Sequence, residues 1–253
     1  MADYKVTDSE LTSIANAIRT KGGTQSQLVF PTGFVSAVNA IPTGGGGEDD
    51  WKSLVSYIES SGTQWIDTGY IPNENNRFEV VVNISSNGGQ YATIFGAREG
   101  GSGQPSDKSC WFGHKQGGTV GMLYSWGTAD ARYPFTPSNS PYIETKCKYV
   151  ATNEGFVVYS IARELPIGTG VSTGDITNTQ PLYLFTLNQN GSEYGGMTRG
   201  VFKLYRLRIY EGSNLVHEFI PWQDNGVACL KDTITGNIKY NAGTGDFVYG
   251  TDS

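Results

Sequence analysis

The chain has 253 residues, among them 34 glycines, 15 tyrosines and 5 tryptophans, and only 17% of its residues are charged. This composition favours many short strands joined by tight turns over a bundle of helices. The formal net charge of −6 argues against a nucleic-acid-binding protein or an anionic-membrane binder, because both need a basic surface. Two small basic clusters, at Lys146–Lys148 and Arg206–Arg208, lie in strand-like runs and are interpreted as a solvated sheet face.

The sequence shows no export or membrane signal. Residues 1–20 lack the apolar core of a secretory signal, and no apolar stretch reaches the roughly 20 residues that span a bilayer. We therefore expect a protein that is made in the cytoplasm without export and does not insert into a membrane. Cys110, Cys147 and Cys229 lie far apart without a Cys-x-x-Cys spacing, which favours reduced core thiols over a disulfide or a metal site.

Residues 1–42 carry a helical pattern. Thr7 and Glu10 form a capping box, and apolar residues follow at spacings of three and four until Gly22 and Gly23 end the helix. A second short helix is predicted from about residue 32 to residue 40, before Pro42. Helices this short are marginal in isolation, so their apolar stripes need a partner. We expect this segment to attach or oligomerise the protein through Leu11, Ile14, Ile18, Phe34 and Val38.

A glycine-rich, acidic linker is predicted at residues 43–50, because glycine has no side chain to pack and leaves the backbone free. From residue 51 the apolar period changes to two, as in Phe78, Val80, Val82 and Ile84, which indicates half-buried strands. Further strands are expected near residues 55–59, 64–68, 90–96, 110–113, 119–125, 142–151, 155–161, 181–187, 201–210 and 215–221, with a closing hairpin at 227–240. The predicted fold is therefore mainly β: a two-sheet antiparallel jelly-roll sandwich over residues 51–253, preceded by the small α-helical N-terminal segment.

Several motifs carry a family resemblance. The stretch Tyr57–Tyr70 (YIESSGTQWIDTGY) resembles the opening signature of concanavalin A-like, laminin-G-like jelly-roll domains of phage and prophage tail-associated proteins. Four later segments resemble the closing strands of that family in the same order: Tyr205–Tyr210 (YRLRIY), Phe219–Pro221, Asp232–Gly236 (DTITG) and Asn241–Phe247 (NAGTGDF). Three N-terminal segments resemble a short module of phage tail proteins: Leu11–Arg19 (LTSIANAIR), Lys21–Thr24 (KGGT) and Pro31–Phe34 (PTGF). The resemblance implies a virion component, and it supplies no ligand.

Catalytic motifs are scarce. Asp67–Gly69 spells the aspartic-protease triplet, but it occurs once, whereas that chemistry needs two carboxylates. The Glu-x-Asp-x-x-Glu run of concanavalin-like glycosidases and the Gly-x-Ser-x-Gly elbow are absent, and two histidines cannot form a histidine metal triad. We therefore expect a protein that is not an enzyme. A glycan-degrading enzyme stays the less favoured alternative, because carboxylates on separate strands can converge. No cofactor is expected, although calcium, which many laminin-G-like domains carry, stays open without a set of ligands.

Aromatic and amide residues in the expected loops indicate a carbohydrate-binding surface, because rings stack on the C–H faces of sugars while amides hydrogen-bond to hydroxyl groups. The candidate ligand-binding residues are Trp111, His114, Tyr124, Trp126, Asn188 and Tyr194. The competing interpretation is that Trp111 and Trp126 are core aromatics.

The leading functional hypothesis is a phage virion protein, namely a tail fibre, tail tip or receptor-binding element. Its N-terminal helices would contact other virion proteins, and its sandwich would bind a host-surface glycan or protein. A homo-oligomer such as a trimer would add avidity for a weak ligand. The alternative is a structural or decoration virion protein whose sandwich has no ligand of its own.

Overall fold

A computed structural model of the chain describes residues 7–22, 30, 34, 55–85, 91–100, 108–115, 121–127, 129–134, 144–160, 166–171, 176–194 and 199–251. Backbone contacts divide the chain into two units, Met1–Lys52 and Ser53–Ser253. The predicted linker at residues 43–50 lies outside the described residues, so its limits stay a prediction. In the part of the chain that is described, no helix is long and apolar enough to cross a membrane.

The first unit contains helix α1 (Asp8–Gly22), and its predicted capping box is confirmed. The amide of Glu10 donates to Thr7 Oγ1 at 3.3 Å, and the amide of Thr7 donates to a carboxylate oxygen of Glu10 at 2.8 Å. The Thr7 amide and hydroxyl lower the pKa of the Glu10 carboxyl, because they stabilise its charged form. These contacts fix where the helix begins.

The predicted attachment residues are only partly described. Leu11 is half-buried, and Ile14 is 47% exposed, next to the buried Ala15. Phe34 is half-buried and makes an edge-to-face contact with Phe30, with 5.5 Å between the ring centroids. Most of the predicted second helix, Val38 and the side chain of Ile18 lie outside the described residues. The attachment role therefore stays a prediction.

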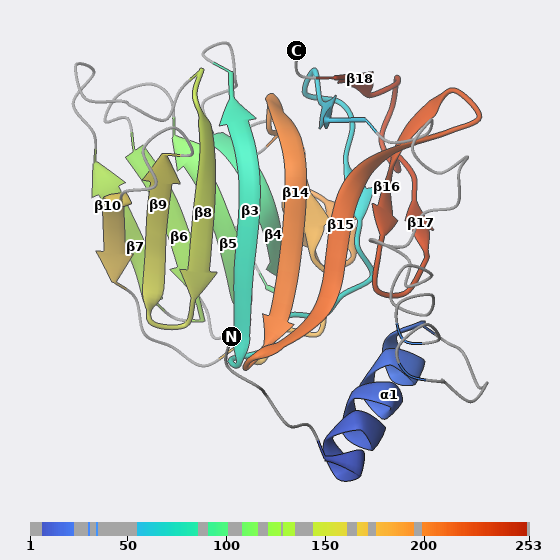
Figure 1. Ribbon diagram of the computed structural model, residues 1–253. Coiled ribbons are helices and arrows are strands. Elements are labelled where there is room, and N and C mark those ends of the chain that lie inside the picture. Colours follow the sequence, from blue (N-terminus) through green and yellow to red (C-terminus); the bar gives the residue numbers. More distant parts are fainter. Residues whose placement is uncertain are drawn as a thin grey trace. The chain divides into compact units, whose positions relative to one another are not determined.

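The second unit contains two sheets. The first faces the viewer in Figure 1 and, in the described ranges, has ten strands in the order β10-β9-β8-β3-β14-β15-β16-β17, with β1 paired to both β14 and β18. All of its recorded pairs are antiparallel. Its strands are β1 (Tyr57–Glu59), β3 (Asn76–Ile84), β8 (Lys146–Thr152), β9 (Gly155–Ser160), β10 (Pro166–Val171), β14 (Phe202–Glu211), β15 (Asn214–Asp224), β16 (Val227–Asp232), β17 (Ile238–Lys239) and β18 (Val248–Gly250).

The second sheet lies behind the first in Figure 1 and has eight strands within the described residues. Its order is β13-β12-β4-β5-β6-β7, and β11 pairs with β2 and β4. The pair of β12 and β4 is parallel, and the other recorded pairs are antiparallel. Its strands are β2 (Ile66–Asp67), β4 (Tyr91–Arg98), β5 (Ser109–Lys115), β6 (Gly121–Trp126), β7 (Ala129–Pro134), β11 (Tyr183–Leu184), β12 (Asn188–Gln189) and β13 (Ser192–Glu193).

The core lies between the two sheets and is rich in aromatic rings. Phe78 of β3 contacts Phe95 of β4, with 4.9 Å between the ring centroids, and Phe112 of β5 contacts Tyr149 of β8 at 5.5 Å. Such contacts join alternate residues of facing strands, as in a β-sandwich. Cys110, Cys147 and Cys229 are buried and free, as predicted, and burial raises the pKa of the Cys147 and Cys229 thiols to about 11.

The sequence prediction of a mainly β chain with two sheets and a short N-terminal helix is confirmed, whereas the jelly-roll topology stays a prediction. The predicted strand at 181–187 is wrong in length: β11 covers Tyr183–Leu184 only. Phe185 follows with a φ of 68°, a left-handed conformation that ends the extended run. Strands β7 and β10 were not predicted, because their segments show no clear apolar alternation.

Candidate functional site

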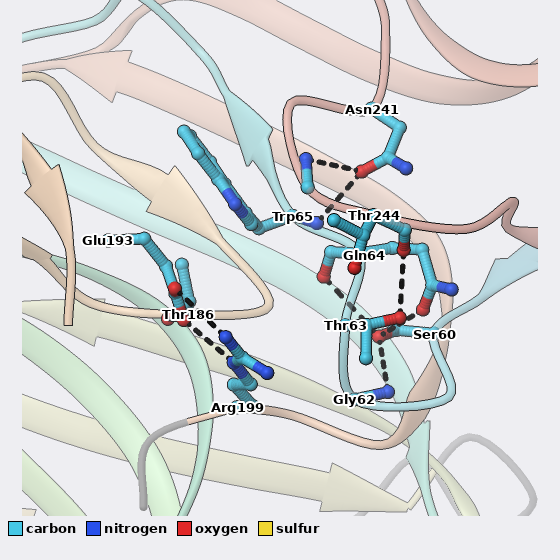
Figure 2. Close-up of polar contacts among 11 residues, drawn as sticks. Ser60, Gly62, Thr63, Gln64, Trp65, Thr186, Glu193, Arg199, Asn241 and Thr244 are labelled. Carbon is cyan, nitrogen blue, oxygen red and sulfur yellow. Dashed lines mark hydrogen bonds and ion pairs between the residues drawn. The ribbon is translucent and has the colours of Figure 1, made fainter. Parts of the chain in front are cut away.

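The segments around Gln64 and Asn241, near the beginning and the end of the second unit, meet in one hydrogen-bonded clasp, which Figure 2 shows beside Trp65. The clasp begins with a turn in which Gln64 Oε1 accepts hydrogen bonds from the Ser60 hydroxyl at 3.1 Å and the Ser61 amide at 2.9 Å. Ser60 and Gln64 are buried. Their polar groups are thus paired within the turn, which fixes the backbone before β2.

The turn is held against the segment after β17. The Thr63 hydroxyl donates to the Thr244 carbonyl at 2.8 Å, and Asn241 Oδ1 accepts from the Trp65 amide at 3.2 Å. A Cβ at Gly243 would lie 2.2 Å from the Thr63 carbonyl oxygen, so this approach requires glycine. The motif residues at both ends of the unit therefore position Trp65 and close the sandwich.

Strand register assembles an outward-facing row across the eight-stranded sheet. Directly paired residues point to the same side of a sheet. Asp67 pairs with Tyr183, Tyr183 with Gly96, Gly96 with Trp111, and Trp111 with Ser125. The neighbours of each row member along its own strand belong to the core. These core residues are Ile66, Leu184, Phe95, Ala97, Cys110, Phe112, Tyr124 and Trp126. Asp67 and Trp111 are half-buried, whereas Tyr183, Gly96 and Ser125 are buried. We call this side of the sheet around the row the aromatic face.

Apolar and aromatic side chains form the centre of the aromatic face. Trp65 stacks on Tyr183, with 4.4 Å between the ring centroids and 25° between the ring planes. Leu187 and Trp111 close over Gly96: their nearest side-chain carbons lie 2.6 and 2.9 Å from where a Cβ at Gly96 would stand. Trp65 and Trp111 are half-buried, so both retain accessible surface.

Trp111 is also fixed in place by a hydrogen bond. Its indole Nε1 donates to Thr93 Oγ1 at 2.9 Å, and Thr93 is fully buried on the neighbouring strand. A ring held in one orientation loses little conformational entropy when a ligand stacks on it. This is the property expected of a preformed stacking surface.

Charged and amide groups border the aromatic face at β4 and β12. Arg98 lies beside Tyr194, with 5.5 Å from the guanidinium carbon to the ring centroid, and its Nη2 donates to Gln189 Oε1 at 2.7 Å. Burial lowers the pKa of Arg98, although an arginine remains protonated at neutral pH. Arg98 and Gln189 are a directly paired couple, one row away from Gly96 and Trp111 along β4 and β5.

A second polar group lies at β13. Arg199 donates from Nε and Nη2 to the two carboxylate oxygens of Glu193 at 2.9 and 3.2 Å, and Thr186 donates to the same carboxylate at 3.2 Å. Figure 2 shows these three residues together on one side of Trp65, with the clasp on the other. These paired charges follow β11 along the chain, the strand that carries Tyr183, whose ring stacks on Trp65.

Among the carboxylates of the described residues, Glu99 has the pKa that is lowered the most. It accepts hydrogen bonds from the hydroxyl and the amide of Thr179 and from Lys108 Nζ, the last at 3.1 Å, and these donors lower the pKa of its carboxyl to about 2. Because its acceptor oxygens are already engaged, Glu99 is suited to holding the loops together rather than to proton transfer.

The structure separates the six candidate ligand-binding residues. Trp111 and Tyr194 are half-buried at the aromatic face, and both border β4. His114, Tyr124 and Trp126 are at most 1% exposed, so their assignment as ligand-binding residues is corrected. They alternate with outward residues and share the inner side of β5 and β6 with Cys110 and Phe112.

Asn188 has a structural role in the hairpin of β12 and β13. It is fully buried, donates to the Pro181 carbonyl at 2.8 Å and accepts from the Gly191 amide at 2.9 Å.

The sequence prediction missed Trp65, Tyr183 and Arg98. Trp65 was visible as a motif residue, but its place beside Tyr183 depends on a pairing between distant strands.

No catalytic arrangement is assembled among the described residues. Asp67 Oδ1 accepts from the Gly69 amide at 2.8 Å, as in a turn, and a second Asp-Thr-Gly triplet is absent from the sequence. His217 Nδ1 lies 2.7 Å from Asp232 Oδ2, but no serine or cysteine among the described residues is hydrogen-bonded to that ring. Within the described ranges no three His, Cys, Asp or Glu side chains form a metal-ligating group. Calcium binding stays an open alternative to the expectation of no cofactor.

Comparisons with known proteins do not place the chain in a family. No family model and no curated protein matches it. One solved structure with some likeness is the full-length tailspike protein 2 from Escherichia coli O157:H7 bacteriophage CAB120, with a TM-score of 0.39 and 12% sequence identity. The match covers 56% of this chain and 20% of the tailspike, which is about one-fifth of its length. A likeness this low carries no argument about function.

Proposed function

We propose that the protein is a structural component of a phage tail whose β-sandwich binds a host-surface carbohydrate at the aromatic face. The motif resemblance supports the setting on a phage particle. The observation that carries the ligand class is Trp111, a half-buried ring that is fixed by Thr93 and lies one row away from the paired Arg98 and Gln189.

The chemistry of the aromatic face suits a sugar. A tryptophan or tyrosine ring presents an apolar surface to the C–H groups of a pyranose, while Arg98, Gln189 and Tyr194 offer polar groups within one or two strands. Carbohydrate sites combine such a rigid apolar platform with a few polar groups that fix orientation. A protein with several copies would gain avidity from weak individual sites.

The test is binding of the full chain to intact host cells and to an array of bacterial surface glycans. We expect Trp111→Ala and Tyr194→Ala each to weaken binding about tenfold, because each removes roughly 1–1.5 kcal/mol of ring stacking. Tyr240→Ala is the matched control, since Tyr240 is 48% exposed, follows β17 at the end of the ten-stranded sheet, and donates its hydroxyl to Asp224. Melting temperatures of the variants establish that the fold is retained.

Two outcomes would count against this proposal. If the unaltered chain binds neither host cells nor any glycan, while it is still incorporated into particles, the protein is a structural component without its own ligand. If the chain binds but both face variants bind as tightly as the Tyr240→Ala control, the ligand lies elsewhere on the sandwich. Release of reducing sugar from a bound glycan would instead support an enzyme.

A further inference from the structure

The outward side of the ten-stranded sheet gathers cations from three neighbouring strands, β8, β3 and β14, which lie side by side in Figure 1. Lys148 pairs with Val81, and Val81 pairs with Arg206. In the next row, Asn83 pairs with both Lys146 and Lys203. The outward cations of this surface, which we call the basic face, are Arg77, Lys146, Lys148, Lys203, Arg206 and Arg208.

Positive charge is in excess on the basic face. Three carboxylates are directly paired with these six cations across the strands: Glu59 with Lys203, and Glu79 and Glu218 with Arg208. Arg77 forms an ion pair with Glu79, and Arg208 forms one with Glu218 at 2.6 Å. Six cations and three carboxylates leave a local excess of three positive charges, on a chain whose formal net charge is −6.

Tyrosine rings hold the lysines in place. Lys146 Nζ lies 3.7 Å from the ring centroid of Tyr205, and Lys203 Nζ lies 4.2 Å from that of Tyr57. The two tyrosine rings contact each other, with 5.8 Å between their centroids, and Lys148 Nζ lies 4.8 Å from the Tyr159 ring. A ring face orients an ammonium group without neutralising its charge. The tyrosine rings therefore hold the ammonium groups of these lysines in fixed positions on the sheet.

We propose that the basic face is a second binding site, which takes a polysaccharide carrying carboxylate or phosphate groups. Outward positions repeat about every 7 Å along a strand and about every 5 Å between strands, so the cations are spread over a broad surface. This spacing suits a sparsely charged polymer, and the tyrosine rings supply flat surfaces for its sugar units. A nucleic acid fits less well, because its dense charge would meet the three carboxylates and the net negative charge of the chain.

The test uses the full chain and polygalacturonate as the carboxylate polymer, with neutral dextran and a short DNA duplex as comparison ligands. We expect binding to polygalacturonate in low salt, weaker binding as salt rises, and none to dextran. Lys146→Gln and Lys203→Gln should each weaken binding about threefold, and together about tenfold, because each removes one surface charge contact. Lys108→Gln is the matched control, since Lys108 lies just before β5 of the eight-stranded sheet, where its Nζ contacts a carboxylate oxygen of Glu99 at 3.1 Å.

The basic face and the aromatic face can fail independently. Trp111→Ala should leave polygalacturonate binding unchanged, and Lys146→Gln with Lys203→Gln should leave neutral glycan binding unchanged. Absence of polygalacturonate binding in low salt, or equal binding by the double variant and the control, would overturn this inference. Tighter binding to DNA than to polygalacturonate would assign the face to nucleic acid. Self-association that the double variant abolishes would assign it to a second copy of the chain.

Discussion

Asn241→Ala tests the clasp that joins the beginning and the end of the sandwich. Asn241 Oδ1 accepts from the Trp65 amide at 3.2 Å and from the Gly243 amide at 2.8 Å, and Nδ2 donates to the Gly245 carbonyl at 2.6 Å. Alanine removes all three bonds and leaves two partly buried amides without this acceptor. The clasp should therefore weaken while the core between the sheets stays intact.

The magnitude follows from the number and exposure of these bonds. A hydrogen bond contributes roughly 0.5–1.5 kcal/mol net to stability, and the bond to Gly245 counts least because it is exposed. We therefore expect the free energy of unfolding to fall by about 2 kcal/mol. For a unit of this size that corresponds to a fall in melting temperature of roughly 4–8 °C. Asn241→Asp keeps the acceptor and should lose less than half as much.

Urea unfolding followed by near-ultraviolet circular dichroism measures this loss, because the signal reports the packed aromatic rings of the sandwich. The midpoint should fall for Asn241→Ala while the denaturant slope stays the same. Asn237→Ala is the matched control, since Asn237 is an exposed asparagine in the preceding turn. A loss below about 0.5 kcal/mol, or an equal loss in the control, would refute a stabilising clasp.

Two further predictions concern the core and the helix. Burial lowers the pKa of His114 to about 4, so the unfolded chain takes up a proton near its ordinary pKa of about 6.5, before the folded protein does. Stability should therefore fall by up to about 3 kcal/mol as pH drops from 6.5 to 4, and His114→Gln should flatten this dependence in urea titrations. In the full chain, Ile14→Asp should block incorporation into phage particles, measured from particle protein content, whereas Ser13→Asp should not. Unchanged pH dependence in His114→Gln, or normal incorporation of Ile14→Asp, would contradict the respective argument.

The architecture was largely predictable because alternation is a local property. Phe78, Val80 and Val82 on β3 and Leu207 and Ile209 on β14 have apolar partners at every second position, and all are fully buried. The exact ends of the strands were not predictable. Phe185 ends β11 through a left-handed backbone conformation, which could not be predicted from its residue type. The Phe185 amide donates to the Ile94 carbonyl, and the Phe185 carbonyl accepts from the Gly200 amide; these tertiary hydrogen bonds hold the conformation.

The candidate ligand residues failed for a related reason. Alternation from Cys110 and Phe112 already implies that His114 points inward and Trp111 outward, so residue type alone was the weaker guide. The partners of Trp111 could not be found this way. Tyr183 lies 72 residues away along the chain and reaches the same row only through the pairings of β11 and β5 with β4, and such register depends on the assembled sheet.

The same reasoning limits what the motif resemblance can say about ligands. Its best-defined residues, such as Gln64, Asn241 and Gly243, lie in the clasp. The fold requires the hydrogen bonds of the Gln64 and Asn241 side chains, and it requires glycine at position 243 because a Cβ there would clash. Another chain with these motifs would therefore share the clasp and still differ at the outward positions of both sheets. The proposed ligand choice of this protein would then depend on those outward positions, Trp111 on one sheet and Lys203 on the other, which are the positions that the binding experiments alter.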